Sequence, residues 1–222
     1  LTGEAVQVAR DDDTVKLLEM PGLHVSYLYF NMVNGPTKDP KVREALIKAV
    51  NVEELTGGVY QYGEAVPASL PLPPGSWGYD EAVKAEVPTY DPEAAKALLA
   101  EAGVSDLHLK LTCAENTNRL NEATIIQDML AQVGITVEIQ SYEAGTFYDM
   151  VDAGETEIFL IGFGAVGFPE PDNNIYGPFN SKQIPTNNMG FYSDPEMDKM
   201  LEAQRNTSDG PEREQIIKDI QK

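Results

Sequence analysis

The clearest pattern along the chain is an alternation of apolar and polar residues over positions 135–142, where Ile135 and Val137 stand between polar neighbours. Residues 107–112 alternate in the same way, and residues 158–163 form a continuous apolar run. Alternation predicts a strand with one buried face, and a short apolar run indicates a strand buried on both faces. We therefore predict three strands in this part of the chain.

Between these strands, apolar residues recur every three to four positions over residues 119–133 and 147–151, which is typical of helices. Residues 107–163 thus read strand, helix, strand, helix, strand, an order that predicts an α/β domain. Two further helices are expected at 196–206 and from Pro211 onward, and no internal repeat is visible.

The first half of the chain predicts one strand and several helices. Residues 24–32 carry apolar side chains on both faces, which favours an interior strand. Asp39 followed by Pro40 marks a helix start, Asn51 can cap a second helix, and residues 93–102 form a third. The apolar stripe expected on the third helix consists of Ala94, Ala97, Leu98 and Ala102.

A proline-rich stretch, residues 57–88, contains Trp77, the single tryptophan of the chain. A loop of this length without regular structure is uncommon inside a compact domain and is usually functional or tightly packed. Trp77 is therefore either a packing anchor or a platform for a ligand.

Two loops follow predicted strands, at residues 113–118 and 164–174. The first is rich in asparagine, and the second combines glycines, Phe168 and acidic residues. Ligands of open α/β sheets bind beyond the carboxyl ends of the strands. If the two strands are parallel neighbours, both loops open at one edge and form a binding site; otherwise the second loop is only a structural exit from a buried strand.

Charge and composition limit the classes of partner and the chemistry that the chain can have. The chain has 16 Lys and Arg against 36 Asp and Glu, a net charge of −20, which repels nucleic acid and anionic lipid. Cys113 is the only cysteine, so no disulfide forms within the chain, and with His24 and His108 as the only histidines we expect no zinc cluster and no catalytic thiol. We expect no cofactor.

Neither a membrane-spanning stretch nor a signal peptide is visible. The chain starts without Met and stops within a helical pattern, so we expect it to be a piece of a longer protein.

The order of motifs resembles the peptide/nickel family of extracytoplasmic solute-binding proteins, family 5. The stretches that carry the resemblance are YFNM at 29–32, DPKVREAL at 39–46, LPPGSWGY at 72–79, YDPEAAKALLAEAG at 90–103, QVGITVEI at 132–139, and Gly162-Phe163 leading to EPDN at 170–173. They cover most of residues 23–205. No single motif is decisive, but six stand in the family's order.

The resemblance implies an α/β lobe of the type II periplasmic-binding-protein kind, with a mixed sheet flanked by helices. Family members have two lobes that enclose a small solute, most often an oligopeptide, and present it to an ABC permease in the membrane. Residues 1–22 would lead in from the first lobe or hinge, 23–210 would form the second lobe, and 211–222 would return toward the first. The location implied is the periplasm or, for a lipoprotein, the outer surface of a bacterial membrane.

The resemblance also suggests where the solute binds. We expect ligand contacts from the two strand-end loops and from Trp77: Asn116, Asn118, Phe163, Gly164, Ala165, Val166, Gly167, Phe168, Asn173 and Trp77. Peptide binders of the family usually carry an Asp in the second loop that pairs with the peptide's amino group. Val166 and Gly167 stand at that position here, so the usual amine clamp is absent and the solute need not be a peptide.

Two other classes of protein remain open. A secreted acidic glycoside hydrolase would need two carboxylates flanking a bond, and Glu115, Glu170 and Asp172 lie on the two loops. A non-catalytic surface domain would need none of these residues.

Overall fold

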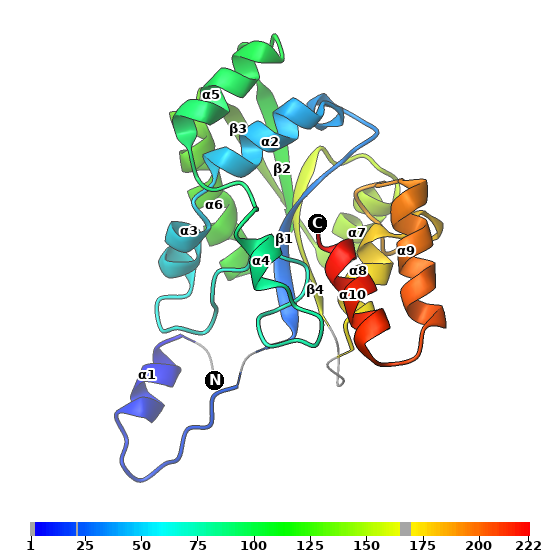
Figure 1. Ribbon diagram of the computed structural model, residues 1–222. Coiled ribbons are helices and arrows are strands. Elements are labelled where there is room, and N and C mark those ends of the chain that lie inside the picture. The colour runs from blue at the N-terminus through cyan, green and yellow to red at the C-terminus, as the bar shows by residue number, and fades with distance from the viewer. Residues whose placement is uncertain (1–2, 21, 165–169) are drawn as a thin grey trace.

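The computed structural model describes residues 3–20, 22–164 and 170–222 (Figure 1). Its helices and strands, in chain order, are α1 (Glu4–Arg10), β1 (His24–Phe30), α2 (Pro40–Ala49), α3 (Val52–Val59), α4 (Glu81–Lys84), α5 (Pro92–Glu101), β2 (His108–Ala114), α6 (Thr117–Gln132), β3 (Thr136–Tyr142), α7 (Ala144–Asp152), β4 (Ile158–Gly164), α8 (Asp172–Phe179), α9 (Pro195–Asn206) and α10 (Pro211–Ile220). Short 3₁₀ turns cover Pro36–Lys38 and Ser181–Gln183.

The four strands form one mixed sheet in the order β1-β4-β2-β3. β2 runs parallel to both β3 and β4, whereas β1 runs antiparallel to β4. Helices flank the sheet, with α2, α3 and α5 on one side and α8, α9 and α10 on the other (Figure 1). The predicted α/β lobe with a mixed sheet is confirmed.

β4 is the inner strand from which the two sides of the core are built. Ile158 and Leu160 join a cluster with α2, α5 and α6, whereas Phe159 and Ile161 join a cluster with α7. All four side chains are buried, so the prediction of a strand buried on both faces is confirmed. A third apolar cluster links Leu72 to α8, α9 and α10.

The helix starts follow the capping signals in the sequence. Asp39, Asp91 and Asp194 each precede a proline, and each side chain accepts a hydrogen bond from the first turn of its helix. Asn51 likewise accepts from Glu54 N. Such caps satisfy backbone N–H groups that have no partner inside the helix.

The prediction that β1 is an interior strand is wrong, because β1 forms an edge of the sheet. Its apolar side chains are nevertheless partly covered, since Val25 is buried and residues 27–30 are half-buried. The Tyr27 hydroxyl donates to Pro71 O at 3.3 Å, and Asn174 Nδ2 donates to Leu23 O and to Pro71 O. The proline-rich stretch therefore contacts β1, and α8 contacts the residue before it.

The stripe predicted for α5 is only partly right, because Leu98 and Ala102 pack against the core but are not its most buried residues. Ala95 and Leu99 are the buried positions, while Ala97 is exposed. Alanine leaves the phase of a helix ambiguous because its small side chain is tolerated on either face.

Some boundaries differ from those predicted. The strand expected over 107–112 runs to Ala114, so Cys113 lies inside β2 and not in the following turn. The stretch at 57–88 is interrupted by the end of α3 and by α4. α1 and α8 were not predicted, and α8 contains Gly177 and Pro178, which are poor helix formers.

Candidate functional site

The parallel strands β2, β3 and β4 end at one edge of the sheet, where antiparallel β1 begins. The register shows this directly: Cys113 lies opposite Leu160, Ala114 opposite Tyr142, and His24 opposite Gly164. We call this end of the sheet the carboxyl edge. β2 and β4 are therefore parallel neighbours, which is the strand arrangement that a shared binding site required.

Asn116 and Asn118 both lie at the carboxyl edge and are exposed. Asn116 caps α6, and its Oδ1 accepts from Asn118 N at 2.9 Å and from Arg119 N at 3.2 Å. Glu115, Asn116, Thr117, Leu120 and Ser141 line a shallow hollow beside this turn. The start of a long helix also carries partial positive charge, so the turn offers amide groups and a favourable field to a polar solute.

Gly164 lies where β1 and β4 approach closely. A Cβ at this position would lie 2.5 Å from the Cα of His24, and one at Gly162 would lie 2.0 Å from the His24 ring. Glycine is therefore required here because a side chain would push the two strands apart. Partial burial lowers the pKa of the His24 imidazole, and the charge of Arg119 lowers it further.

Phe163 packs into the body of the lobe. Its ring lies 6.1 Å from that of Tyr29, which itself stacks on Phe159 at 5.3 Å. Phe163 is half-buried in this aromatic cluster, so its ring supports the end of β4. The neighbouring candidates Ala165, Val166, Gly167 and Phe168 lie outside the described residues.

Trp77 and Asn173 lie among α8, α9 and α10. Trp77 is half-buried against the cluster of Leu72 and Ile217, with the Arg213 guanidinium 5.3 Å from its ring centroid. This surrounding matches the packing alternative for Trp77. Asn173 is exposed on the first turn of α8.

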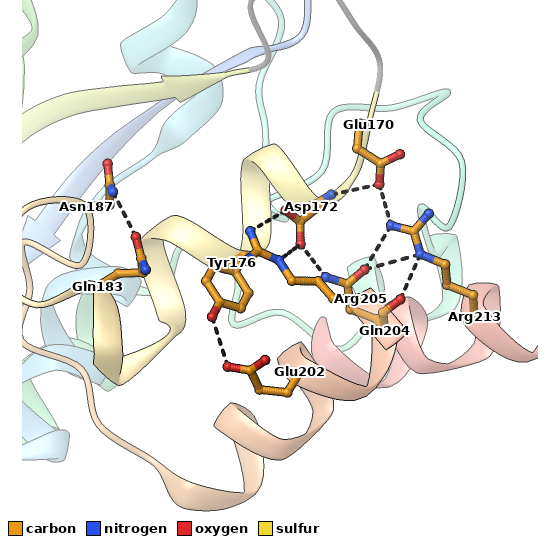
Figure 2. Close-up of polar contacts among 9 residues, drawn as sticks. All are labelled: Glu170, Asp172, Tyr176, Gln183, Asn187, Glu202, Gln204, Arg205 and Arg213. Carbon is orange, nitrogen blue, oxygen red and sulfur yellow. Dashed lines mark hydrogen bonds and ion pairs between the residues drawn. The ribbon is translucent and has the colours of Figure 1, made fainter. Parts of the chain in front are cut away.

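Glu170 and Asp172 are both held by arginines (Figure 2). Arg213 pairs with Glu170, and Arg205 donates to both oxygens of Asp172, at 2.8 and 2.6 Å. The buried Gln204 amide accepts from Arg213 Nη2 at 2.9 Å and donates to Asp172. These pairings tie the start of α8 to α9 and α10, an ordering role for the two carboxylates.

A polar network at the carboxyl edge was not predicted from the sequence. It consists of Tyr60, Glu122, Arg119 and Ser26. Glu122 is only 4% exposed, and its carboxylate accepts from the Tyr60 hydroxyl and from Arg119 Nη1, each at 2.7 Å. Arg119 Nη1 also donates to Ser26 Oγ on β1. A charged residue on the buried stripe of α6, three positions after an arginine, was the available signal.

The electrostatics of this network follow from burial. Burial, together with the hydrogen bond to Glu122, raises the pKa of Tyr60 to about 12. Tyr60 therefore keeps its proton at neutral pH, and its hydroxyl donates the hydrogen bond to Glu122.

Other candidate chemistry finds no support in the described part of the chain. Among those residues, no group of three or more His, Cys, Asp or Glu side chains could hold a metal ion. Cys113 is fully buried, and burial raises the pKa of its thiol, which disfavours the reactive thiolate. None of the described helices is both long and apolar enough to span a membrane.

The chain matches a known family. Residues 1–186 match the bacterial extracellular solute-binding proteins, family 5 Middle. The dipeptide-binding protein of Escherichia coli (strain K12) is 40% identical over 171 residues, covering 74% of this chain and 31% of that protein. Heme-binding protein A of Haemophilus influenzae is 32% identical over 218 residues, covering 96% of this chain and 39% of that protein.

Comparison with solved structures leads to the same family. The ABC transporter-associated periplasmic binding protein DppA from Helicobacter pylori, in complex with the peptide STSA, superposes with a TM-score of 0.86 at 30% identity, covering 99% of this chain and 43% of that one. The fold and these matches define a solute-binding protein lobe, and the chain belongs to family 5 of the bacterial extracellular solute-binding proteins.

Family membership answers the question of whether the chain is an enzyme. The members are binding proteins and not enzymes, and the glycoside hydrolase alternative finds no support. The chain spans between 31% and 39% of the length of the two curated relatives named above.

Proposed function

We propose that this chain is the second lobe of an extracytoplasmic receptor that captures a small polar solute for an ABC importer. The observation that carries the proposal is the parallel pairing of β2 and β4, which brings the turn at Asn116 and Asn118 to the edge where β4 ends. In this arrangement the carboxyl edge forms one wall of the solute cleft. The permease and the first lobe are the expected protein partners.

The exposed side chains of the lead-in segment support the presence of a first lobe beside this chain. Among large apolar side chains of the described residues, the five most exposed are Val8, Val15, Leu18, Met20 and Val66. Met20 is 88% exposed and Leu18 76%. Four of the five lie within residues 8–20, and we assign this segment to an interface with the rest of the receptor polypeptide.

The segment is also anchored to the lobe at one place. Arg10 Nη1 donates to Tyr62 O at 2.7 Å, and Gly3 N donates to Glu64 Oε1 at 2.6 Å. We propose that residues 1–22 connect to the first lobe, that 23–210 form the second lobe, and that 211–222 begin the segment that leads back to the first lobe.

The proposed solute is peptide-like. Peptide binding by the E. coli and H. pylori relatives supports this class, and asparagine amides at the carboxyl edge suit peptide groups. Val166 and Gly167 in place of the amine-binding Asp predict that the peptide's amino terminus is held differently. The H. influenzae relative, named as a heme-binding protein, shows that the fold alone does not choose the solute.

The test uses the full-length receptor and the peptide STSA as a first probe, with affinity measured by calorimetry. Asn118→Ala removes an exposed amide at the carboxyl edge and is expected to weaken binding about fivefold to tenfold, the effect of one hydrogen bond. Gln132→Ala, about 21 Å away along α6, is the matched control and should leave affinity unchanged.

Equal affinity in the wild type and Asn118→Ala would remove this turn from the cleft. If the wild type binds neither STSA nor a series of dipeptides and tripeptides, the peptide-like solute is wrong. Native mass spectrometry of the receptor purified from its host would then identify the solute that it carries.

A further inference from the structure

The first turn of α6, which carries Asn118, is held by side chains from three elements. Arg119 lies in this turn and donates a hydrogen bond to Ser26 on β1. Glu122 lies one turn later and accepts hydrogen bonds from Arg119 and from Tyr60, which follows the last residue of α3. Ser26 lies opposite Gly162 on β4. The side chains around Glu122 thus connect α3, α6 and the β1–β4 pair within a few residues of the carboxyl edge.

Burial makes the geometry of this network specific. The Glu122 side chain is 5% exposed and that of Arg119 is 20% exposed. A buried carboxylate is stable only when it is paired and hydrogen-bonded. Tyr60 and Arg119 bind different oxygens of Glu122, so moving either partner leaves one of those oxygens without its hydrogen bond.

The arrangement differs from an ordinary surface ion pair. Exposed pairs such as Lys96–Glu93 and Lys199–Glu196 join residues of one helix and contribute little. Arg119 uses the two N–H groups of one nitrogen to join Glu122 on its own helix to Ser26 on another element. This bridge places the helix start relative to the sheet.

We propose that Glu122 is a positioning residue of the solute-binding edge. It fixes the Arg119 guanidinium and the Tyr60 hydroxyl, and thereby holds Asn116 and Asn118 at a defined place relative to β1 and β4. The proposal rests on the proposed function for its effect on binding, but its structural part can be tested without a solute.

The test compares Glu122→Gln and Tyr60→Phe in the full-length receptor. Hydrogen exchange at the first turn of α6 (residues 117–120) is measured beside exchange at its last turn (residues 129–132), and affinity for STSA is measured by calorimetry. Tyr60→Phe removes one hydroxyl and keeps the ring, so it remains informative if Glu122→Gln folds poorly. Glu53→Gln, an exposed glutamate on α3, is the matched control.

In both variants, exchange should rise about tenfold in the first turn and not in the last, and STSA binding should weaken by about the same factor. Glu53→Gln should change neither quantity. A residue that only stabilises the fold would instead raise exchange along the whole of α6.

The proposal is overturned if first-turn exchange is unchanged in both variants, or if it rises equally at both ends of α6. Unchanged STSA affinity in variants with a loosened first turn would also overturn it. If the wild type fails to bind STSA, that result counts against the peptide-like solute alone, and the exchange measurement decides the role of Glu122.

Discussion

Asn116 combines two roles in one side chain. Its Oδ1 caps α6 by accepting from two backbone N–H groups, while the residue as a whole is exposed at the carboxyl edge. The capping oxygen is therefore engaged, and the Nδ2 group is the part left to contact a solute. Binding and stability effects at this position must be separated.

Asn116→Ala should lower the free energy of unfolding by about 1 kcal/mol, because it leaves N–H groups of the first turn without their acceptor. Asn116→Ser keeps a capping oxygen and should retain most of that stability. Urea denaturation measures the free energy of unfolding of both variants.

The control is Asn121→Ala, an exposed asparagine on α6 with an expected change within about 0.5 kcal/mol. Equal losses in the alanine variants at 116 and 121 would show that the cap contributes nothing. Asn116→Ser is then the better variant for binding studies, since it removes the amide and leaves the helix start intact.

At the scale of elements, α10 is an integral part of this lobe, because its apolar face is buried against it. Ile217 is fully buried and Ile220 nearly so, in a cluster with Leu72 and Leu201. A Cβ at Gly78 would lie 2.6 Å from Ile217 Cγ2, so the proline-rich stretch packs tightly on the helix. The return toward the first lobe that we propose would therefore begin with a helix that packs on this lobe.

Ile217→Ala should destabilise the lobe by about 2–5 kcal/mol, because it leaves a cavity among α8, α9 and α10. Thermal or urea unfolding of the 222-residue chain measures the change. Ile47→Ala on α2, where the side chain is 40% exposed, is the matched control and should cost less than about 1 kcal/mol. Similar costs for both substitutions would mean that α10 does not pack on this lobe in solution.

At the scale of the whole molecule, the exposed apolar residues and the length of the relatives lead to one expectation. The side chains of Val8, Val15, Leu18 and Met20 have few neighbours here, and Figure 1 shows α1 standing away from the sheet. In the complete receptor this segment should be covered by the other lobe.

Backbone amides of residues 8–20 should therefore exchange more slowly in the full-length receptor than in the 222-residue chain, because packing suppresses local opening. Hydrogen exchange with mass spectrometry measures this difference peptide by peptide. The peptides of α2 should exchange alike in both proteins and serve as the internal control. Equal exchange of residues 8–20 in the two proteins would contradict the two-lobe arrangement.

Local signals in the sequence predicted most of the elements. The caps at Asp39, Asn51, Asp91 and Asp194 act within three residues of themselves, and the strand–helix alternation over 107–163 follows from short-range periodicity. Signals of this kind need no knowledge of the fold. The same reasoning missed α8, because Gly177 and Pro178 oppose a helix that packing against α9 and β4 stabilises.

The sequence by itself determined the class of fold, the order of its main elements and the family, because these depend on local patterns and on motif order. Only the tertiary structure decided that β1 is an edge strand, that β2 and β4 are parallel neighbours, and that Glu122 joins α3, α6 and β1 through Tyr60 and Arg119. These features depend on contacts between residues about 45 to 140 positions apart. Strand order and the contacts of the Arg119–Glu122 pair with Ser26 and Tyr60 are set by how whole surfaces fit together, so no local pattern encodes them.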